Sequence, residues 1–423
     1  MKPKLMTTMR DYSWRMFLSD SLAGVTVALV ALPLSVAIAI ASGADPRAGL
    51  VTAIIGGFLI SLLGGSRVQI GGPTGAFIVV VYGVIDQYGF DGLLLATLMA
   101  GVILIVGGFL RAGRFVALVP ESVIEGFTIG IAIIIAVSQL KDLLGLSAAN
   151  VPADLIEALP ALWAAIDALN PAALAVGIVA IAGIAVLRHF APWFPGSLLV
   201  IAAASAAVAL LALPVDTIGS RFGALPAGLP LPSLPHVSIA RISELLPSAF
   251  VIAFLAGVES LLSAIVADRM IGGRHRSDAE LLAAGAANIA SPLFGGLPVT
   301  GAIARTATNV RAGGRTPVSG IVHALIILLI TLAVGGLAGY LAMPALAGLL
   351  IVTAWMMSEP SRWGDRLRLR AGDRILLFVT MVLTVFSDLT IAIAVGTVAG
   401  LALRLIRRDV EPAEWTPSDR SKL

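Results

Sequence analysis

The sequence predicts an all-α polytopic membrane protein with fourteen transmembrane segments. Of its 423 residues, 58% are hydrophobic and only 13% are charged, whereas a soluble domain carries about 25% charged residues. Apolar runs of about 20 residues, long enough to cross a hydrocarbon layer of ~30 Å, recur from Leu22 almost to the C-terminus. Soluble enzymes and nucleic-acid-binding proteins are therefore excluded.

Hydropathy gives the boundaries of the expected spans in chain order: 22–42, 48–65, 73–89, 93–112, 121–141, 172–188, 196–213, 247–268, 278–294, 299–311, 317–340, 342–358, 373–388 and 389–406. Two sets of seven spans, 22–213 and 247–406, are thus flanked by an N-terminal segment 1–21, a connection 214–246 and a tail 407–423. The stretches 150–170 and 214–246 are richer in Pro and polar residues and are expected to be extracellular, the first with an amphipathic helix that carries Trp163.

The basic residues predict the orientation. Of the 28 Lys and Arg residues, 23 fall in loops assigned to one side of the membrane and four in loops on the other. The positive-inside rule makes the richer side cytoplasmic, and an even number of spans puts both termini there. The expected location is therefore the inner (plasma) membrane. A net charge of +3 then reflects topology and indicates no nucleic-acid partner.

Residue types typical of metal centres and catalysis are missing. The chain has no Cys, and its four His residues are scattered without ligand spacing, so neither a disulfide nor a metal site with thiolate or clustered His ligands is expected. The sequence has no HExxH motif and no Ser or acid pair with a recognisable base. We therefore expect a protein that is not an enzyme and needs no cofactor.

Gly and Pro interrupt two of the predicted spans in similar contexts. "FLISLLGG" (58–65) precedes "VQIGGPTGAF" (68–77), and "NIASPLFGG" (288–296) precedes "LPVTGAIAR" (297–305). The repeated Thr-Gly-Ala triplets lie 226 residues apart, more than half the chain. Because each half has seven spans, an odd number, the second copy must enter from the opposite face, which makes an inverted repeat.

Each interruption predicts a half-helix whose N-terminus lies inside the membrane. We expect these helices to begin near Pro73 and Pro298, since Pro is favoured in a first helical turn. Such an end exposes unpaired N–H groups and about half a positive charge, and must line a cavity. Two facing ends predict an anion site formed by Thr74, Gly75, Ala76, Thr300, Gly301 and Ala302.

Two ionisable residues lie within spans close to the proposed anion site. Glu259 lies twelve residues into the eighth span, about 18 Å along the helix, where a bare carboxylate is costly. It could hold a proton, share a Na⁺ with Ser263 one turn later, or serve only packing as a protonated acid. Arg305 is the one Lys or Arg that is not assigned to a loop on either side of the membrane. It could pair with Glu259, add positive potential to the anion site, or extend toward the cytoplasmic face.

Three further acids are expected to have local roles. Asp20 precedes the first span and is most simply an N-cap. Glu121 and Glu125 follow Pro120 at the start of the fifth span, where acids stabilise the helix dipole.

The whole chain resembles the membrane domain of the SulP family, the sulfate-permease-type anion transporters. The resemblance rests on "DSLAGVTVALVALPLSVAIAIASG" (20–43), "QIGGPTGAF" (69–77), "PESVIEGFTIGIAI" (120–133), "AGVESLLSAIVADRM" (256–270) and "LPVTGAIARTATNVRAGGRTPVSGI" (297–321). It implies seven plus seven inverted segments, divided into a core that carries substrate and a gate. It also implies an anion site between spans three and ten that involves Thr74, Gly75, Ala76, Glu259, Ser263, Gly301, Ala302 and Arg305.

Many relatives continue into a cytoplasmic STAS domain, of which this sequence shows no part, so regulation or assembly through such a domain is left open. The function expected is transport of a small oxyanion by alternating access, with sulfate and bicarbonate ahead of small dicarboxylates. Coupling to H⁺ or Na⁺ through Glu259 is favoured over uncoupled exchange. A nucleobase permease, a passive anion channel and, least of all, an intramembrane enzyme remain alternatives, and assembly into a homodimer stays open.

Overall fold

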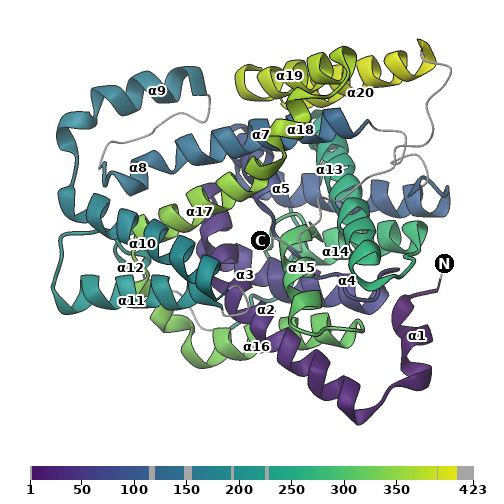
Figure 1. The fold of residues 1–423 in the computed structure, drawn as a ribbon, viewed down its shortest axis with the longest axis horizontal. Helices are drawn as coiled ribbons and strands as arrows, with labels where there is room; N and C mark the ends of the chain where they lie inside the picture. The colour runs from purple at the N-terminus through teal and green to yellow at the C-terminus, as the bar shows by residue number, and fades with distance from the viewer. Residues whose placement is uncertain are drawn as a thin grey trace.

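A computed structural model describes residues 2–113, 120–146, 155–191, 195–223, 228–387 and 389–406, and within them the chain is almost entirely helical (Figure 1). The predicted tail 407–423 lies outside the described residues. The first half contains α1 (Lys4–Thr8), α2 (Trp14–Ala41), α3 (Pro46–Val51), α4 (Gly57–Leu63), β1 (Gly71–Gly72), α5 (Ile78–Phe109), α7 (Glu121–Ser138), α8 (Leu140–Leu143), α9 (Leu155–Ala164), α10 (Pro171–Phe190), α11 (Gly196–Leu210) and α12 (Ile218–Phe222). The second contains α13 (Ile239–Ile271), α14 (Ser277–Leu293), β2 (Thr300–Gly301), α15 (Ile303–Arg311), α16 (Val318–Val334), α17 (Met343–Met357), α18 (Trp363–Leu367), α19 (Ala371–Phe386) and α20 (Leu389–Ile406).

Every one of the fourteen predicted spans corresponds to helical structure. Spans three and four both lie in α5, separated at Gly89, whose φ of 71° and ψ of 175° are not helical. Span two consists of α3 and α4 joined by a π-helical turn at Thr52–Gly56. In the described part of the chain, seven helical stretches are long and apolar enough to cross a membrane. The all-α polytopic fold is thus confirmed.

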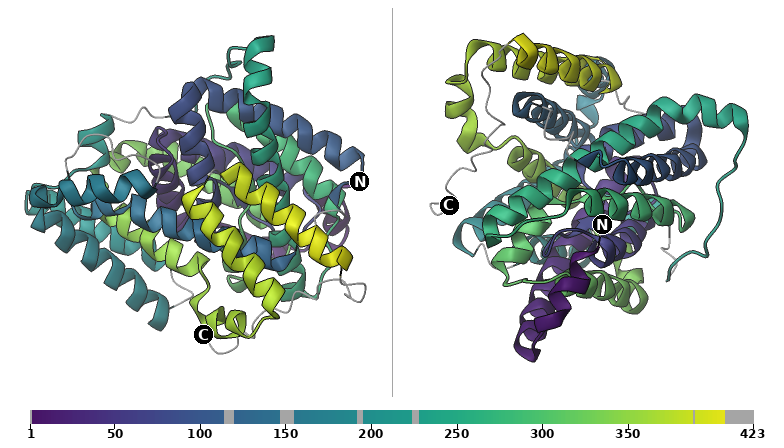
Figure 2. Two further views of the ribbon diagram at one scale, coloured as in Figure 1. Left: turned by 90° about the horizontal axis from the view of Figure 1, so that it is seen from above. Right: turned by 90° about the vertical axis from the view of Figure 1, so that its right-hand side faces the viewer.

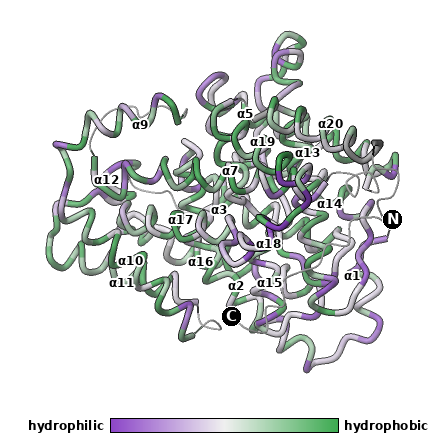
Figure 3. Tube along the Cα trace, turned by 45° about the horizontal axis from the view of Figure 1, so that its top comes forward, coloured by the Kyte–Doolittle hydropathy of each residue, from purple (hydrophilic) through white to green (hydrophobic). Residues whose placement is uncertain are grey.

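The helices pack as two groups. In the first group, α5 packs against α13 and α14, and α2 packs against α16. In the second, α7 packs against α17 and α19, and α10 packs against α17; Figure 2 shows α19 and α20 side by side at the surface. Contacts of α2 with α11 and α17 join the groups. Hydrophobic residues dominate the trace except in α1 and some turns (Figure 3), as expected of helices that face lipid.

Asp20 is not an N-cap, contrary to the prediction. Helix α2 begins earlier, at Trp14, and the side chain of Ser13 caps it by accepting a hydrogen bond from the N–H of Met16. Asp20 lies within the helix, is fully buried, and accepts hydrogen bonds from the N–H groups of Arg315 and Thr316 at 2.7 and 3.2 Å. This acid therefore ties α2 to the turn that precedes α16.

Glu121 and Glu125 have partners that the sequence did not suggest. Glu121 pairs with Arg362 at 3.0 Å, while Glu125 pairs with Arg362 at 2.8 Å and with Arg366 at 3.3 Å. The two arginines come from the turn and short helix after α17, more than 230 residues away. The acids thus join α7 to the turn and short helix after α17, and Glu121 also stands in the first turn of α7.

Candidate functional site

Two short strands bring the interrupted segments together. β1 and β2 pair antiparallel, with Gly71 opposite Gly301 and Gly72 opposite Thr300. A 3₁₀ turn at Gly75–Phe77 follows β1 and continues into α5, and α15 follows β2 directly. Two helix starts, one from each half of the chain, therefore lie beside one strand pair in the interior.

The second half-helix begins later than predicted. α15 starts at Ile303, five residues beyond Pro298, so Pro298 belongs to the extended segment before β2 and not to a first helical turn. The strand register also changes the internal alignment, because Thr300 lies in a strand whereas Thr74 lies two residues beyond one. The two Thr-Gly-Ala triplets therefore do not occupy equivalent positions in the repeat, and the alignment that matches them is wrong by about as many residues as one helical turn contains.

This strand register determines which N–H groups at the two helix starts have hydrogen-bond acceptors and which do not. The N–H of Gly301 donates to Ser260 Oγ at 3.0 Å and that of Ala302 donates to the carbonyl of Ile70 at 2.8 Å. Within the described residues, no acceptor is hydrogen-bonded to the N–H groups of Gly75 and Ala76 or to the first three of α15, which belong to Ile303, Ala304 and Arg305. These are the donors that a helix start leaves free.

Helix α13 fixes the strand pair from one side. The hydroxyl of Thr300 donates to the carbonyl of Ala256 and shares a hydrogen bond with Ser260, both at 3.1 Å. One turn later Ser263 and Thr306 share a hydrogen bond of 3.1 Å, and Thr306 Oγ1 accepts from the N–H of Ile70. In this conformation Ser263 thus supports α15 and is not hydrogen-bonded to Glu259.

Glu259 connects α13 to the first half-helix. Thr74 Oγ1 donates to Glu259 Oε2 at 2.7 Å, and the carboxylate makes no ion pair with any described cation. Gly75, the residue after Thr74, faces α7 and α17, because a Cβ added there would meet Met357 Sδ at 3.1 Å and Ile135 Cδ1 at 3.4 Å. The carboxylate therefore lies beside the contact between the two helix groups.

Arg305 is buried, with 2% of its surface exposed, so it does not extend to the membrane surface. Its Nη2 donates to Ser35 Oγ of α2 at 3.1 Å, whereas Nη1 has no hydrogen-bond partner among the described residues and lies against Gly72. A Cβ at Gly72 would come within 2.2 Å of Nη1, and the φ of 149° there also favours glycine. Arg305 forms no ion pair with any carboxylate in the described residues, so the pairing with Glu259 considered from the sequence is absent from them.

The sequence reasoning missed several polar residues around this site. Gln69 has 3% exposure and both its amide atoms lack partners, and its Nε2 occupies the place where a Cβ of Gly301 would lie. His323 on α16 is fully buried with both ring nitrogens unpartnered. The position of His323 in the sequence gave no signal, whereas Gln69 stands two residues before the Gly-Gly-Pro break that begins at Gly71. Ser35 and Ser260 sit in apolar helices, where a polar residue was the available clue.

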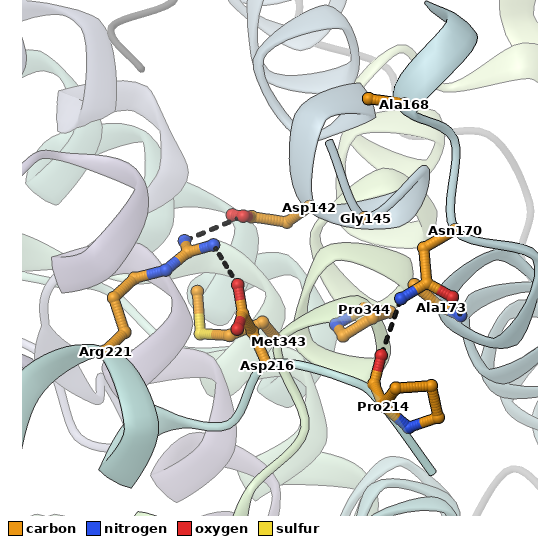
Figure 4. Close-up of a pocket in the computed structure, with 10 residues that line it drawn as sticks. All are labelled: Asp142, Gly145, Ala168, Asn170, Ala173, Pro214, Asp216, Arg221, Met343 and Pro344. Carbon is orange, nitrogen blue, oxygen red and sulfur yellow. Dashed lines mark hydrogen bonds and ion pairs between the residues drawn. The ribbon is translucent and has the colours of Figure 1, made fainter. Parts of the chain in front are cut away.

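A cavity of about 220 Å³ lies elsewhere, lined by residues that include Asp142, Asn170, Asp216 and Arg221 (Figure 4). Arg221 pairs with Asp142 at 2.7 Å and with Asp216 at 3.2 Å. The side chain of Asn170 donates to the carbonyl of Pro214 at 2.6 Å. These bonds tie the chain after α11 to α8 and the start of α10, so the cavity is a structural junction.

Comparison with known proteins agrees with this arrangement. The sulfate permease family model matches residues 17–380. The putative sulfate transporter YvdB of Bacillus subtilis is 42% identical over 92% of this chain and 73% of its own length. The bicarbonate transporter BicA of Picosynechococcus is 31% identical over 92% of this chain and 70% of its own.

Solved structures are similar in fold as well. The transmembrane domain of a cyanobacterial bicarbonate transporter BicA superimposes with a TM-score of 0.80 at 30% identity, covering 92% of this chain and 98% of that domain. SLC26A9 superimposes with a TM-score of 0.86 at 17% identity, covering 96% of this chain and 68% of that one, which supports the fold alone. With paired half-helices, a matching family model and these relatives, the chain belongs to the sulfate permease family, whose members are transporters and not enzymes.

Proposed function

We propose that the protein carries a small inorganic oxyanion, sulfate or bicarbonate, across the membrane by alternating access. The observation that carries the proposal is Arg305, a buried cation with an unused Nη1 and no carboxylate partner among the described residues. Burying an unpaired charge costs several kcal/mol. A bound anion at Nη1 would offset that cost, and so supplies a reason for keeping the charge there.

The two helix starts supply further donors to the same ligand class. Open N–H groups at Gly75 and Ala76, and at the first residues of α15, stand where the macrodipoles of both helices are positive. An oxyanion with three or four oxygens suits several such donors, whereas a neutral ring does not need them. The substrate names of the relatives, sulfate and bicarbonate, belong to the same chemical class.

Glu259 is the proposed coupling group. Its carboxylate is close to the start of the first half-helix through Thr74, and its negative charge opposes an anion unless a proton or Na⁺ offsets it. Cation and anion would then promote each other's binding. Ser263 contributes to a Na⁺ site only if it releases Thr306, so we assign the proton or Na⁺ first to Glu259 and Thr74.

The membrane arrangement completes the proposal. We place the chain in the inner (plasma) membrane with both termini cytoplasmic, and assign substrate transport to α2–α5 and α13–α16 moving against the other helices. In this proposal the segment 214–246 connects two repeats of seven spans each. Pairing of two chains into a homodimer stays a prediction.

The test is uptake by the purified protein in liposomes. Labelled sulfate, bicarbonate, succinate and uracil are supplied in turn under an imposed pH gradient, an imposed Na⁺ gradient, or neither. We expect accumulation of one oxyanion driven by one of the gradients. Uptake of uracil without either oxyanion would instead assign a nucleobase permease, and currents far above transporter turnover would assign a channel.

A further inference from the structure

Three basic residues from separate segments converge near the N-terminus. The N–H of Lys4 in α1 donates to the carbonyl of Gly64 at 2.8 Å, at the end of α4. The N–H of Arg276, which precedes α14, donates to the carbonyl of Gly65 at 3.1 Å. Arg67 lies two residues further along the same loop and is exposed. Lys4 and Arg276 therefore adjoin the loop 64–67, which itself carries Arg67.

These cations have little compensation. None of the three makes an ion pair with a carboxylate in the described part of the chain. The pKa of Lys4 lies below its ordinary value because of burial and then because of the charges of Arg67 and Arg276, with only Asp268 acting in the opposite direction. Asp268 itself pairs with His275 at 2.7 Å. The cluster is thus an electropositive site without its counter-ion.

The acid nearest the loop is also engaged. Glu280 is buried and accepts a hydrogen bond from the N–H of Ser66. Glu280 thus holds the loop through a backbone N–H and forms no ion pair with the three basic side chains in the described part of the chain. Arg276 also donates through Nη1 to the carbonyl of Lys2 at 2.6 Å, so the N-terminal segment is held against the loop by backbone atoms that a charge substitution at Lys4 does not remove.

The surroundings of the cluster are those of a membrane surface. Trp14 and Phe17 stack with ring centroids 5.1 Å apart, and Trp14 is 71% exposed. Leu18 and Leu22 continue this exposed apolar face along α2, which therefore suits contact with lipid from about Trp14 onward. Helix α1, with exposed Met6, lies at the edge of the molecule beside α4 (Figure 1). An amphipathic segment with basic and apolar residues at this level is typical of interfacial lipid contact.

We propose that Lys4, Arg67 and Arg276 together bind the phosphate headgroup of an anionic phospholipid. The acyl chains would lie along the exposed apolar face of α2, which a water-soluble phosphate does not need. The site has a direct route to the half-helices, because Arg67 precedes β1 by four residues, at most about 14 Å of extended chain. A bound headgroup would therefore hold α1 and the loop together and restrain the segment that leads to β1.

The test counts lipids retained by the full-length protein in native mass spectrometry, with phosphatidylglycerol titrated against phosphatidylcholine. Each basic residue near an anionic lipid surface contributes about a factor of five to binding. The double variant K4Q/R67Q should therefore bind phosphatidylglycerol about 25-fold more weakly than the wild type, and K4Q alone about fivefold. The control R368Q/R370Q, which removes two exposed charges from another loop expected on the same side, should bind as the wild type does.

Three results would overturn the assignment. Equal phosphatidylglycerol retention by K4Q/R67Q and the wild type would remove the site, and an equal loss in the control would reduce it to overall charge. In the third arm, glycerol 3-phosphate is added at the same concentration as phosphatidylglycerol. Displacement of the lipid would then assign the site to a soluble phosphate instead. Because K4Q keeps the backbone bond of Lys4 to Gly64, an unchanged melting temperature in this variant separates loss of lipid from loss of fold. None of these readouts depends on transport.

Discussion

Replacing Arg305 with Gln removes the buried guanidinium that we assign to the anion. Nη1 lies unpaired against Gly72, so the wild-type side chain can give a bound oxyanion a charge-assisted hydrogen bond that Gln cannot reproduce. Hydrogen bonds to charged groups contribute about 1.5–3 kcal/mol. The Arg305→Gln substitution should therefore raise the apparent KM for the oxyanion by roughly 10- to 150-fold.

The same substitution should not destabilise the empty protein. It removes the 3.1 Å bond to Ser35, a loss of about 1–3 kcal/mol, but it also removes a buried charge whose desolvation costs several kcal/mol. The melting temperature without anion should thus equal or exceed that of the wild type. Added anion should raise the melting temperature of the wild type by mass action, and the variant should need a 10- to 150-fold higher concentration.

The assay combines initial rates of labelled oxyanion uptake into liposomes with thermal unfolding in detergent at several anion concentrations. Arg311→Gln is the matched control, because Arg311 lies in the last turn of the same helix and is exposed. An Arg305→Gln protein whose KM and anion-dependent melting match those of the wild type would refute the reasoning. So would an equal change in the Arg311 control.

Three other substitutions test neighbouring parts of the structure. Glu259→Gln mimics a neutralised carboxylate and should keep anion exchange while losing accumulation driven by a cation gradient, so a variant that still concentrates substrate would remove Glu259 from coupling. Gly72→Ala forces a Cβ to within 2.2 Å of Arg305 Nη1 at a φ of 149°. The strain should cost about 1–3 kcal/mol of folding free energy, seen as a lower melting temperature together with a raised KM for the oxyanion. A KM like that of the wild type would contradict the placement of Nη1 against Gly72. Arg366→Gln leaves Glu125 with one partner fewer in a buried pair and should lower stability by up to about 3–5 kcal/mol, while the double variant with Glu125→Gln should recover part of the loss in thermal unfolding; a fully additive loss would argue against the pair.

Part of the candidate site was predictable because its chemistry is local. The Gly and Pro breaks at 71–73 and 295–298, the acid Glu259 and the lone intramembrane Arg305 are each visible in a short stretch of sequence. The roles of the individual backbone N–H donors could not be predicted in this way. Gly301 and Ala302 look like free donors in the sequence, yet Ser260 and Ile70 occupy their N–H groups.

The sequence by itself determined the class and the spans of this protein. A hydrocarbon layer of ~30 Å accepts only backbone that satisfies its own hydrogen bonds, so about 20 contiguous apolar residues identify a crossing helix without knowledge of its neighbours. Local capping rules were less reliable, and they failed at Asp20, because its partners Arg315 and Thr316 lie about 295 residues away.

Only the tertiary structure decided the strand register, the start of α15 at Ile303, and the partners of Glu121 and Glu125. These features depend on which segments meet after the helices pack. Small residues, Gly71 and Gly301 among them, allow several registers, and the pairing observed is the one that also satisfies Ser260, Thr306 and the backbone of Ile70. A pattern along one chain carries no information about contacts that only the assembled bundle creates.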